Sequence, residues 1–248
     1  MKSSPFRAAL LVLAAASLGA CNAPQGQAPG PASTVPAADS PQLQSDLKMY
    51  QGLLARKQYA LAAPIGAGLI KRAPHSHAAD EVRKTLADAQ SKADAINEER
   101  RLQGLWLYQT GEQSGGTQHT ATIYPSTPDW AHGRVRLILR RHSDWGQSVY
   151  LYDTGDAGFV CKGNCKLAFR IDGAPVKALT GYLPETGEPA MFIDHDKAFL
   201  KQLEAAHTLD IQVHGKGRDP VDLHFEVAGF DADKWPAIHA AKKPKSRH

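Results

Sequence analysis

The stretch Val135-Arg-Leu-Ile-Leu-Arg140 decides the fold class of the C-terminal half of this chain. Aliphatic residues at 135, 137 and 139 alternate with arginines at 136 and 140, which is typical of a β-strand that buries one face and exposes the other. The run Lys166-Leu-Ala-Phe-Arg-Ile171 repeats this alternation. The runs are separated by residues that favour turns, so together they predict an antiparallel sheet.

Short runs of the same kind fill residues 104–235. One helix is expected among them, from Asp196 to Ala206, with Phe199 and Leu203 facing inward. This spacing of short strands predicts an antiparallel β-sandwich or a partly closed barrel with one inserted helix. The expected strands lie near residues 104–110, 117–124, 133–141, 147–153, 157–162, 165–171, 174–181, 189–193, 208–214 and 220–227.

Residues 41–103 have a helical period instead. Ser40-Pro41 predicts a helix start, because serine caps helices and proline fits their first position. A second helix is expected over residues 58–72, and a long third one after the cap Ser76. The stretch from Lys57 to Ala79 resembles a tetratricopeptide-type helical hairpin, although a generic hairpin fits equally well. The fold class is therefore α+β: a helical hairpin with a long third helix, then the β domain.

Residues 1–20 are expected to be a signal peptide. A charged start at Lys2 and Arg7 precedes an apolar run that is too short to span a membrane as a helix. The segment closes as Leu18-Gly-Ala-Cys21, which resembles the bacterial lipobox. That resemblance implies that Cys21 is acylated and becomes the mature N-terminus. An ordinary signal peptide followed by a chance cysteine is the alternative.

The segment after Cys21 is expected to be a tether. Residues 21–40 are rich in proline, alanine, glycine and glutamine, a composition that buries no core and favours an extended chain. Asn22 stands where aspartate would signal inner-membrane retention, so resemblance to Gram-negative sorting rules implies the outer membrane. We therefore expect an outer-membrane protein that is lipid-anchored and faces the periplasm.

Cys161 and Cys165 are the two cysteines that remain once Cys21 is assigned to lipid. In an oxidising compartment such a close pair most simply forms a disulfide, and Gly-Asn between them favours a turn. A redox dithiol usually has a two-residue spacer, and a zinc site would need further ligands. A disulfide is the prediction.

The region around this pair carries a family resemblance. Gly158-Phe-Val-Cys161, Cys165-Lys-Leu167 and Phe169-Arg-Ile-Asp-Gly173 resemble a domain of uncharacterised exported proteins and lipoproteins of Gram-negative bacteria. A weaker similarity links the chain to the invasion-associated locus B family, which also joins a small disulfide loop to a β-rich exported fold. Neither resemblance implies a catalytic residue.

Charge argues against a nucleic-acid partner. The chain has 29 basic and 25 acidic residues, and two of the basic ones lie in the leader and four in the last seven residues. The remaining 23 basic residues nearly balance the acidic ones, so no strongly basic surface is expected. The basic segment 236–248 is expected to be disordered.

Two polar clusters invite a catalytic interpretation. Asp153-Thr-Gly155 resembles the aspartic-protease motif, but no second copy occurs, so a homodimer would be needed and a turn is the simpler interpretation. Asp194-His195-Asp196 has the residues for a metal site or a base with its orienting carboxylate. It lies where a strand precedes a helix, so one aspartate is better explained as an N-cap. No catalytic residue, metal ligand or cofactor is assigned.

The four tryptophans are candidates for an exposed binding surface. Trp106 alternates into a strand and is expected in the core, whereas Trp130 and Trp145 lie in loop-like contexts and are the candidate binding residues. Two functions are open. One is a non-catalytic binding or assembly module of the cell envelope, with a protein, peptide or glycan partner. The alternative is an envelope hydrolase or metal-dependent enzyme near Asp194-His195-Asp196.

Overall fold

A computed structural model describes residues 39–126 and 135–238. Its N-terminal part consists of three helices, α1 (Pro41–Ala55), α2 (Tyr59–Arg72) and α3 (His77–Gly104). The expected caps are confirmed. Ser40 Oγ accepts the N–H of Leu43 at 3.3 Å, and Ser76 Oγ accepts that of Ala79 at 3.1 Å.

The first three helices pack around Tyr50. This ring is 1% exposed, and its hydroxyl lies 2.9 Å from Thr85 Oγ1 of α3. Gly66 of α2 faces the ring so closely that a Cβ there would stand 2.7 Å from it. Glycine at 66 therefore brings α2 against both α1 and α3, and Pro64 leaves α2 continuous.

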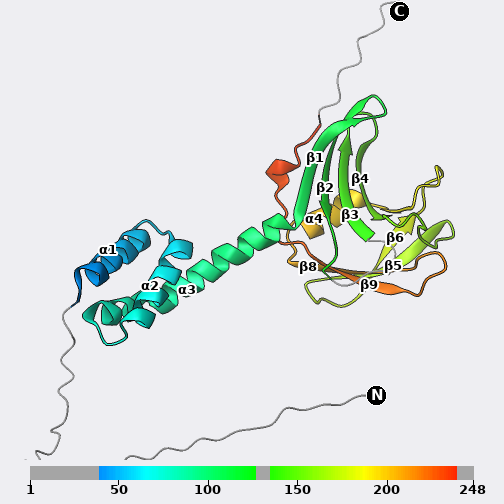
Figure 1. Cartoon of the computed structure of the whole chain (residues 1–248). Helices are drawn as coiled ribbons and strands as arrows, with labels where there is room; N and C mark the ends of the chain where they lie inside the picture. Colours follow the sequence, from blue (N-terminus) through cyan, green and yellow to red (C-terminus); the bar gives the residue numbers. More distant parts are fainter. Residues whose placement is uncertain (1–38, 127–134, 239–248) are drawn as a thin grey trace, which may run out of the picture.

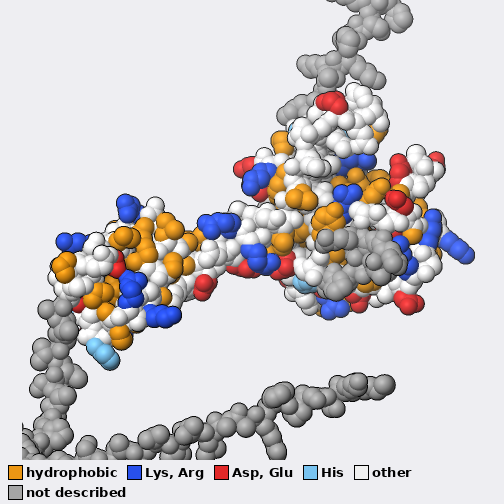
Figure 2. Space-filling model, in the orientation of Figure 1, with side chains coloured by type: hydrophobic (Ala, Val, Ile, Leu, Met, Phe, Trp, Pro, Cys, Tyr) orange, Lys and Arg blue, Asp and Glu red, His pale blue; other side chains and the backbone are white. Residues whose placement is uncertain are grey.

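Helix α3 extends from this helical core to the β domain (Figure 1). Its 28 residues span about 42 Å at 1.5 Å per residue. Buried positions end at Ala93, and the exposed stretch between Ala93 and the β domain is rich in charged side chains (Figure 2). The buried positions of α3 therefore run from Ala78 to Ala93, in the part of the helix that packs beside α2.

The β domain is a single antiparallel sheet of nine strands, in the order β1-β2-β3-β4-β7-β6-β5-β8-β9. The α+β class and the inserted helix, α4 (Asp196–Leu203), are confirmed, and the sheet does not close into a barrel. The strands are β1 (Trp106–Gln113), β2 (Gly116–Ile123), β3 (Val135–His142), β4 (Gly146–Asp153), β5 (Asn164–Ile171), β6 (Lys177–Tyr182), β7 (Ala190–Ile193), β8 (Thr208–Val213) and β9 (Val221–Glu226).

The short strand β7 joins two halves of four strands each. It pairs with β4 over three residues and with β6 over two, so the halves bend away from each other (Figure 1). The core lies inside this bend, where α4 contributes Phe199, Leu200 and Leu203. Trp106 is 4% exposed, as expected, and Trp235 is fully buried, with its Nε1 donating to the carbonyl of His119 at 3.1 Å.

The strand expected at 157–162 is absent. That segment contributes one isolated bridge, between Phe159 and Gly215. Gly158 has a φ of 73°, outside the β region, because the segment turns around the carboxylate of Asp153. Within the described ranges, none of the helices is both long enough and apolar enough to cross a membrane.

Candidate functional site

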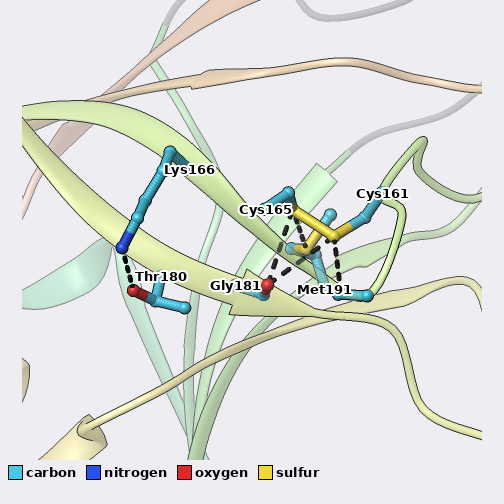
Figure 3. The surroundings of a disulfide bond; sticks show 7 residues. Cys161, Cys165, Lys166, Thr180, Gly181 and Met191 are labelled. Atoms are coloured by element: carbon cyan, nitrogen blue, oxygen red, sulfur yellow. Dashed lines mark hydrogen bonds between the residues drawn. A yellow bond between two sulfur atoms is a disulfide. The ribbon is translucent and has the colours of Figure 1, made fainter.

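Cys21 and Trp130 lie outside the described residues, so their expected roles stay predictions. The Cys161–Cys165 disulfide is present, with the two Cα atoms 5.5 Å apart. Figure 3 shows the sulfurs against Gly181 of β6 and Met191 of β7. Cys165 Sγ lies 3.5 Å from the Gly181 carbonyl oxygen and 3.8 Å from Met191 Sδ. Disulfide sulfurs carry no proton, so these are packing contacts, and the bridge fastens the segment before β5 to the sheet.

Asp153 is part of a buried turn. Its carboxylate is fully buried and accepts the backbone N–H groups of Gly155 at 2.9 Å and Gly158 at 3.0 Å. Arg218 Nη1 lies 3.4 Å from Oδ2. The turn interpretation of Asp153-Thr-Gly155 is confirmed, because the carboxylate holds a loop together rather than facing a cleft.

The Asp194-His195-Asp196 cluster is a helix start facing solvent. His195 occupies the N-cap of α4 with a φ of 54°, so the expectation that an aspartate takes this place is wrong. Asp194 Oδ1 accepts the N–H of His195, and Asp196 Oδ1 accepts that of Lys197. The His195 side chain is 85% exposed. Among the described residues, no three His, Cys, Asp or Glu side chains stand together as a metal site.

A different group of side chains gathers on the outer face of the sheet. We call it the aromatic–arginine stripe. Tyr150 of β4 is paired with Phe192 of β7, which is paired with Tyr182 of β6, so these rings share one face. Their centroids lie 4.8 and 5.6 Å apart. The stripe consists of Arg136, Arg140, Trp145, Tyr150, Tyr152, Tyr182 and Phe192.

Arg140 lies at the centre of the stripe. Its Cζ is 5.2 Å from the ring centroids of both Trp145 and Tyr150 and 5.8 Å from that of Phe192. Its Nε donates to Ser148 Oγ at 3.0 Å. A guanidinium among aromatic faces is attracted by the negative side of each ring's quadrupole, which favours this position of the side chain.

The two arginines of the stripe have no acidic partner among residues 39–126 and 135–238. In the described part of the chain, neither Arg136 nor Arg140 takes part in an ion pair. Arg136 stands over Tyr152 at 5.3 Å, and its Nε is buried without a hydrogen-bond acceptor. Burial raises the pKa of Tyr150, against the opposing effect of both arginines, so this phenol stays neutral at physiological pH.

Trp145 forms the exposed end of the stripe. It lies in the β3–β4 turn, is 50% exposed, and stacks on His142 with ring centroids 3.8 Å apart. Sequence reasoning found this residue but missed Arg140 and Tyr150. The available signal was the alternation in β3 and β4, which places Arg136 with Arg140, and Tyr150 with Tyr152, on the outward faces.

Comparison with known proteins adds little. No family model matches the chain, and neither does any curated protein. Among solved structures, the chain is similar to the crystal structure of invasion-associated protein B from Bartonella henselae. The two are 18% identical, and the match covers 50% of this chain and 84% of that one at a TM-score of 0.32. A likeness this weak supports no conclusion about fold or activity.

Proposed function

We propose that this chain is a non-catalytic binding module of the cell envelope, anchored to the outer membrane by lipid on Cys21. Its ligand is an acidic glycan that binds the aromatic–arginine stripe. The observation that carries this proposal is Arg140, which stands among three aromatic rings without a carboxylate partner in the described residues.

The charge of the stripe favours an acidic ligand. Two guanidinium groups that have no ion pair within the described residues lie on one face, and a guanidinium binds a carboxylate or phosphate through two parallel hydrogen bonds. The aromatic rings reduce the access of water to Arg140, which strengthens its attraction for an anion. A neutral ligand would leave both charges uncompensated.

The position of the stripe favours a glycan over a polypeptide. Strands β3, β4, β7 and β6 each have a neighbour on both sides, and the backbones of Tyr150, Phe192 and Tyr182 lie within these pairings. An extended peptide there would gain no backbone hydrogen bonds, which are its usual source of affinity on a sheet. A sugar ring instead packs its C–H groups on aromatic rings and needs only side chains.

Helix α3 gives the module its reach. Beyond its last buried residue, Ala93, the helix continues for 11 residues, or about 16 Å, toward the β domain, and the expected tether adds the segment 21–40. Such a spacer suits a protein that is fixed at the membrane and contacts a layer at some distance from it. No observation in the described residues favours the enzymatic alternative at Asp194-His195-Asp196.

A direct titration tests the proposal. Full-length protein, purified in detergent, is titrated with oligosaccharides of alginate, which carry a carboxylate on each sugar, and with neutral dextran of equal length. We expect saturable binding to alginate alone, and a loss of at least tenfold in affinity in Arg140→Gln. Arg170→Gln is the matched control, because Arg170 lies on the outer face of the other half and pairs with Asp210.

Two outcomes would overturn the proposal. Equal affinity in Arg140→Gln and the wild-type chain would remove the stripe as the site. Tight binding of polyglutamate in place of alginate would assign the stripe to an acidic polypeptide.

A further inference from the structure

The two edges of the sheet differ in how they are covered. At the β9 edge, the N–H of Ser126 donates to the carbonyl of His224 at 2.7 Å, and Glu226 accepts Ser126 Oγ at 2.8 Å. At the β1 edge, the Gln113 carbonyl oxygen lies 2.9 Å from His142 Nε2, and residues 230–234 contact the Trp106 and Tyr108 side chains. No other described segment adds a backbone–backbone hydrogen bond to β1 beyond those to β2. Figure 1 shows β1 at the margin of its half of the sheet.

The pairing of the neighbouring strands tells which groups of β1 point outward. The N–H of Ser143 donates to the Thr117 carbonyl at 2.9 Å, so Thr117 bonds toward β3 and Gln118 bonds toward β1. Gln118 is opposite Gly111, whose main-chain groups therefore face β2. Alternation then places the free N–H and C=O groups of Tyr108, Thr110 and Glu112 on the open edge.

This edge lacks the features that usually prevent pairing. Natural edge strands carry lysines, prolines or bulges, or are short. β1 is eight residues long, is paired without interruption to β2, and is exposed along its length apart from Trp106 and Tyr108. Glu112 is its one charged residue, and it contains no proline.

We propose that the β1 edge pairs with the β1 edge of a second copy of this chain. The two strands run antiparallel about a two-fold axis at Thr110, so that Thr110 faces Thr110 and Tyr108 faces Glu112 of the second copy. Three opposed pairs of outward residues, with two hydrogen bonds each, give six main-chain hydrogen bonds. The two Glu112 side chains do not face each other, so this register has no like-charge conflict.

A second copy fits this edge. The self-pairing uses every outward group from Tyr108 to Glu112, and the interface is self-complementary, as two-fold dimers require. The axis is perpendicular to the sheet, so the stripes of both copies lie on the same side and a long ligand contacts both. This proposal goes beyond the ligand of the stripe and does not depend on its chemistry.

Cysteine crosslinking in cells tests the register. In an antiparallel hydrogen-bonded pair the Cα atoms are about 5.5 Å apart, which a disulfide spans. We expect full-length Thr110→Cys to give a band of twice the chain mass on non-reducing gels. Gln113→Cys is the matched control: it is exposed on the same strand but faces Leu107 of the second copy, so it should stay monomeric.

Charge substitution supplies a second test that does not depend on a disulfide. Copies with two different tags are co-expressed, and co-purification is measured. Thr110→Lys alone and Thr110→Glu alone should each lose co-purification at least fivefold, because each charge faces itself. A mixture of the two should restore it.

The outcomes separate the occupants of the edge. Restored pairing in the mixture supports the two-fold register. Undiminished co-purification in both single variants overturns it. A loss in both variants that the mixture does not restore also overturns the second copy and assigns the edge to a foreign extended segment. In either of these cases the alginate titration is unchanged, so the proposed function is tested separately.

Discussion

Asp153 is the residue on which the loop between β4 and β5 depends. Its fully buried carboxylate accepts two loop N–H groups and an Arg218 contact, so truncation leaves buried donors without an acceptor. We expect Asp153→Ala to lower the free energy of unfolding by about 2–4 kcal/mol in urea titrations. Asp156→Asn removes an exposed charge from the same loop, and asparagine tolerates its positive φ, so stability should barely change. An equal loss in both variants would contradict this role for Asp153.

Arg101 of α3 links the two parts of the molecule through Glu226 of β9. Its hydrogen bond lowers the pKa of Glu226, with Ser126 contributing, and it also lowers the pKa of Glu98. Both carboxylates therefore stabilise the fold above their ordinary pKa near 4.5, and this contribution is lost as the pH falls through their lower folded-state values.

The measurement is the free energy of unfolding between pH 7 and pH 3. We expect stability to fall below about pH 4.5, and to fall less steeply in Glu226→Gln. Glu185→Gln, which changes an exposed carboxylate away from this joint, serves as the control. If the free energy of unfolding fell with pH equally in Glu226→Gln and in the wild-type chain, the Arg101–Glu226 pair would contribute nothing to stability.

At the residue level, sequence pattern was sufficient where one residue type has one physical use. Ser40 and Ser76 cap helices because a serine oxygen accepts a helical N–H, and Cys161 pairs with Cys165 because their spacing allows little else. Arg140 could not be recognised this way. An arginine on an exposed strand face is ordinary, and its partners come from three other segments that only the folded sheet brings together.

Among the elements, the disulfide before β5 has a local role. It closes a loop of only five residues, so the chain-entropy gain is about 2 kcal/mol, below the ~3 kcal/mol of a fifteen-residue loop. We expect the double variant Cys161→Ala/Cys165→Ala to fold with about that loss, measured by urea titration. In the wild-type chain, purified without reductant, neither cysteine should react with a thiol reagent. Full labelling of both would contradict the bridge.

The contact between α3 and the β domain depends on Gly229. A Cβ at this position would lie 2.1 Å from the carbonyl carbon of Leu102, so any side chain must push the helix away. We expect Gly229→Ala to cost about 1–3 kcal/mol in thermal unfolding and to change the scattering profile in solution.

The control for this contact is Gly104→Ala, whose expected change in stability has the opposite sign. Gly104 ends α3 with no atom within 4 Å of an added Cβ, so Gly104→Ala should stabilise by about 0.5–1 kcal/mol through its better helix propensity. An unchanged scattering profile in Gly229→Ala would show that the helix can shift without leaving the β domain.

One strand that the sequence predicted does not form, and the reason can be identified. Residues 157–162 have the composition of a strand, yet they form one bridge only, because Asp153 and the disulfide hold the two ends of the segment in non-β geometry. Neither constraint is visible in local residue preference. For the same reason, the pairing of β7 between β4 and β6 was not predictable, since it joins strands that are distant in sequence.

At the scale of the whole molecule, we propose that α3 and a tether hold the β domain at a distance from a lipid anchor. Replacing Cys21 by Ser removes the thiol that is expected to be acylated. Each buried CH₂ group of the acyl chains contributes about 0.8 kcal/mol to membrane binding, so the anchor is lost without them. We expect Cys21→Ser to leave the membrane fraction. Recovery of this variant with outer membranes after a salt wash would refute the lipid anchor.

Photo-crosslinking in intact cells tests the central claim, that the stripe contacts an acidic glycan of the envelope, most directly. Benzoylphenylalanine placed at Tyr182, a 40% exposed ring of the stripe at the end of β6, is compared with the same residue at Val176, which is 57% exposed and lies just before the start of that strand. The account predicts a carbohydrate adduct at 182 that Arg140→Gln abolishes, and none at 176. Equal adducts at both positions, or a polypeptide as the adduct at 182, would contradict it.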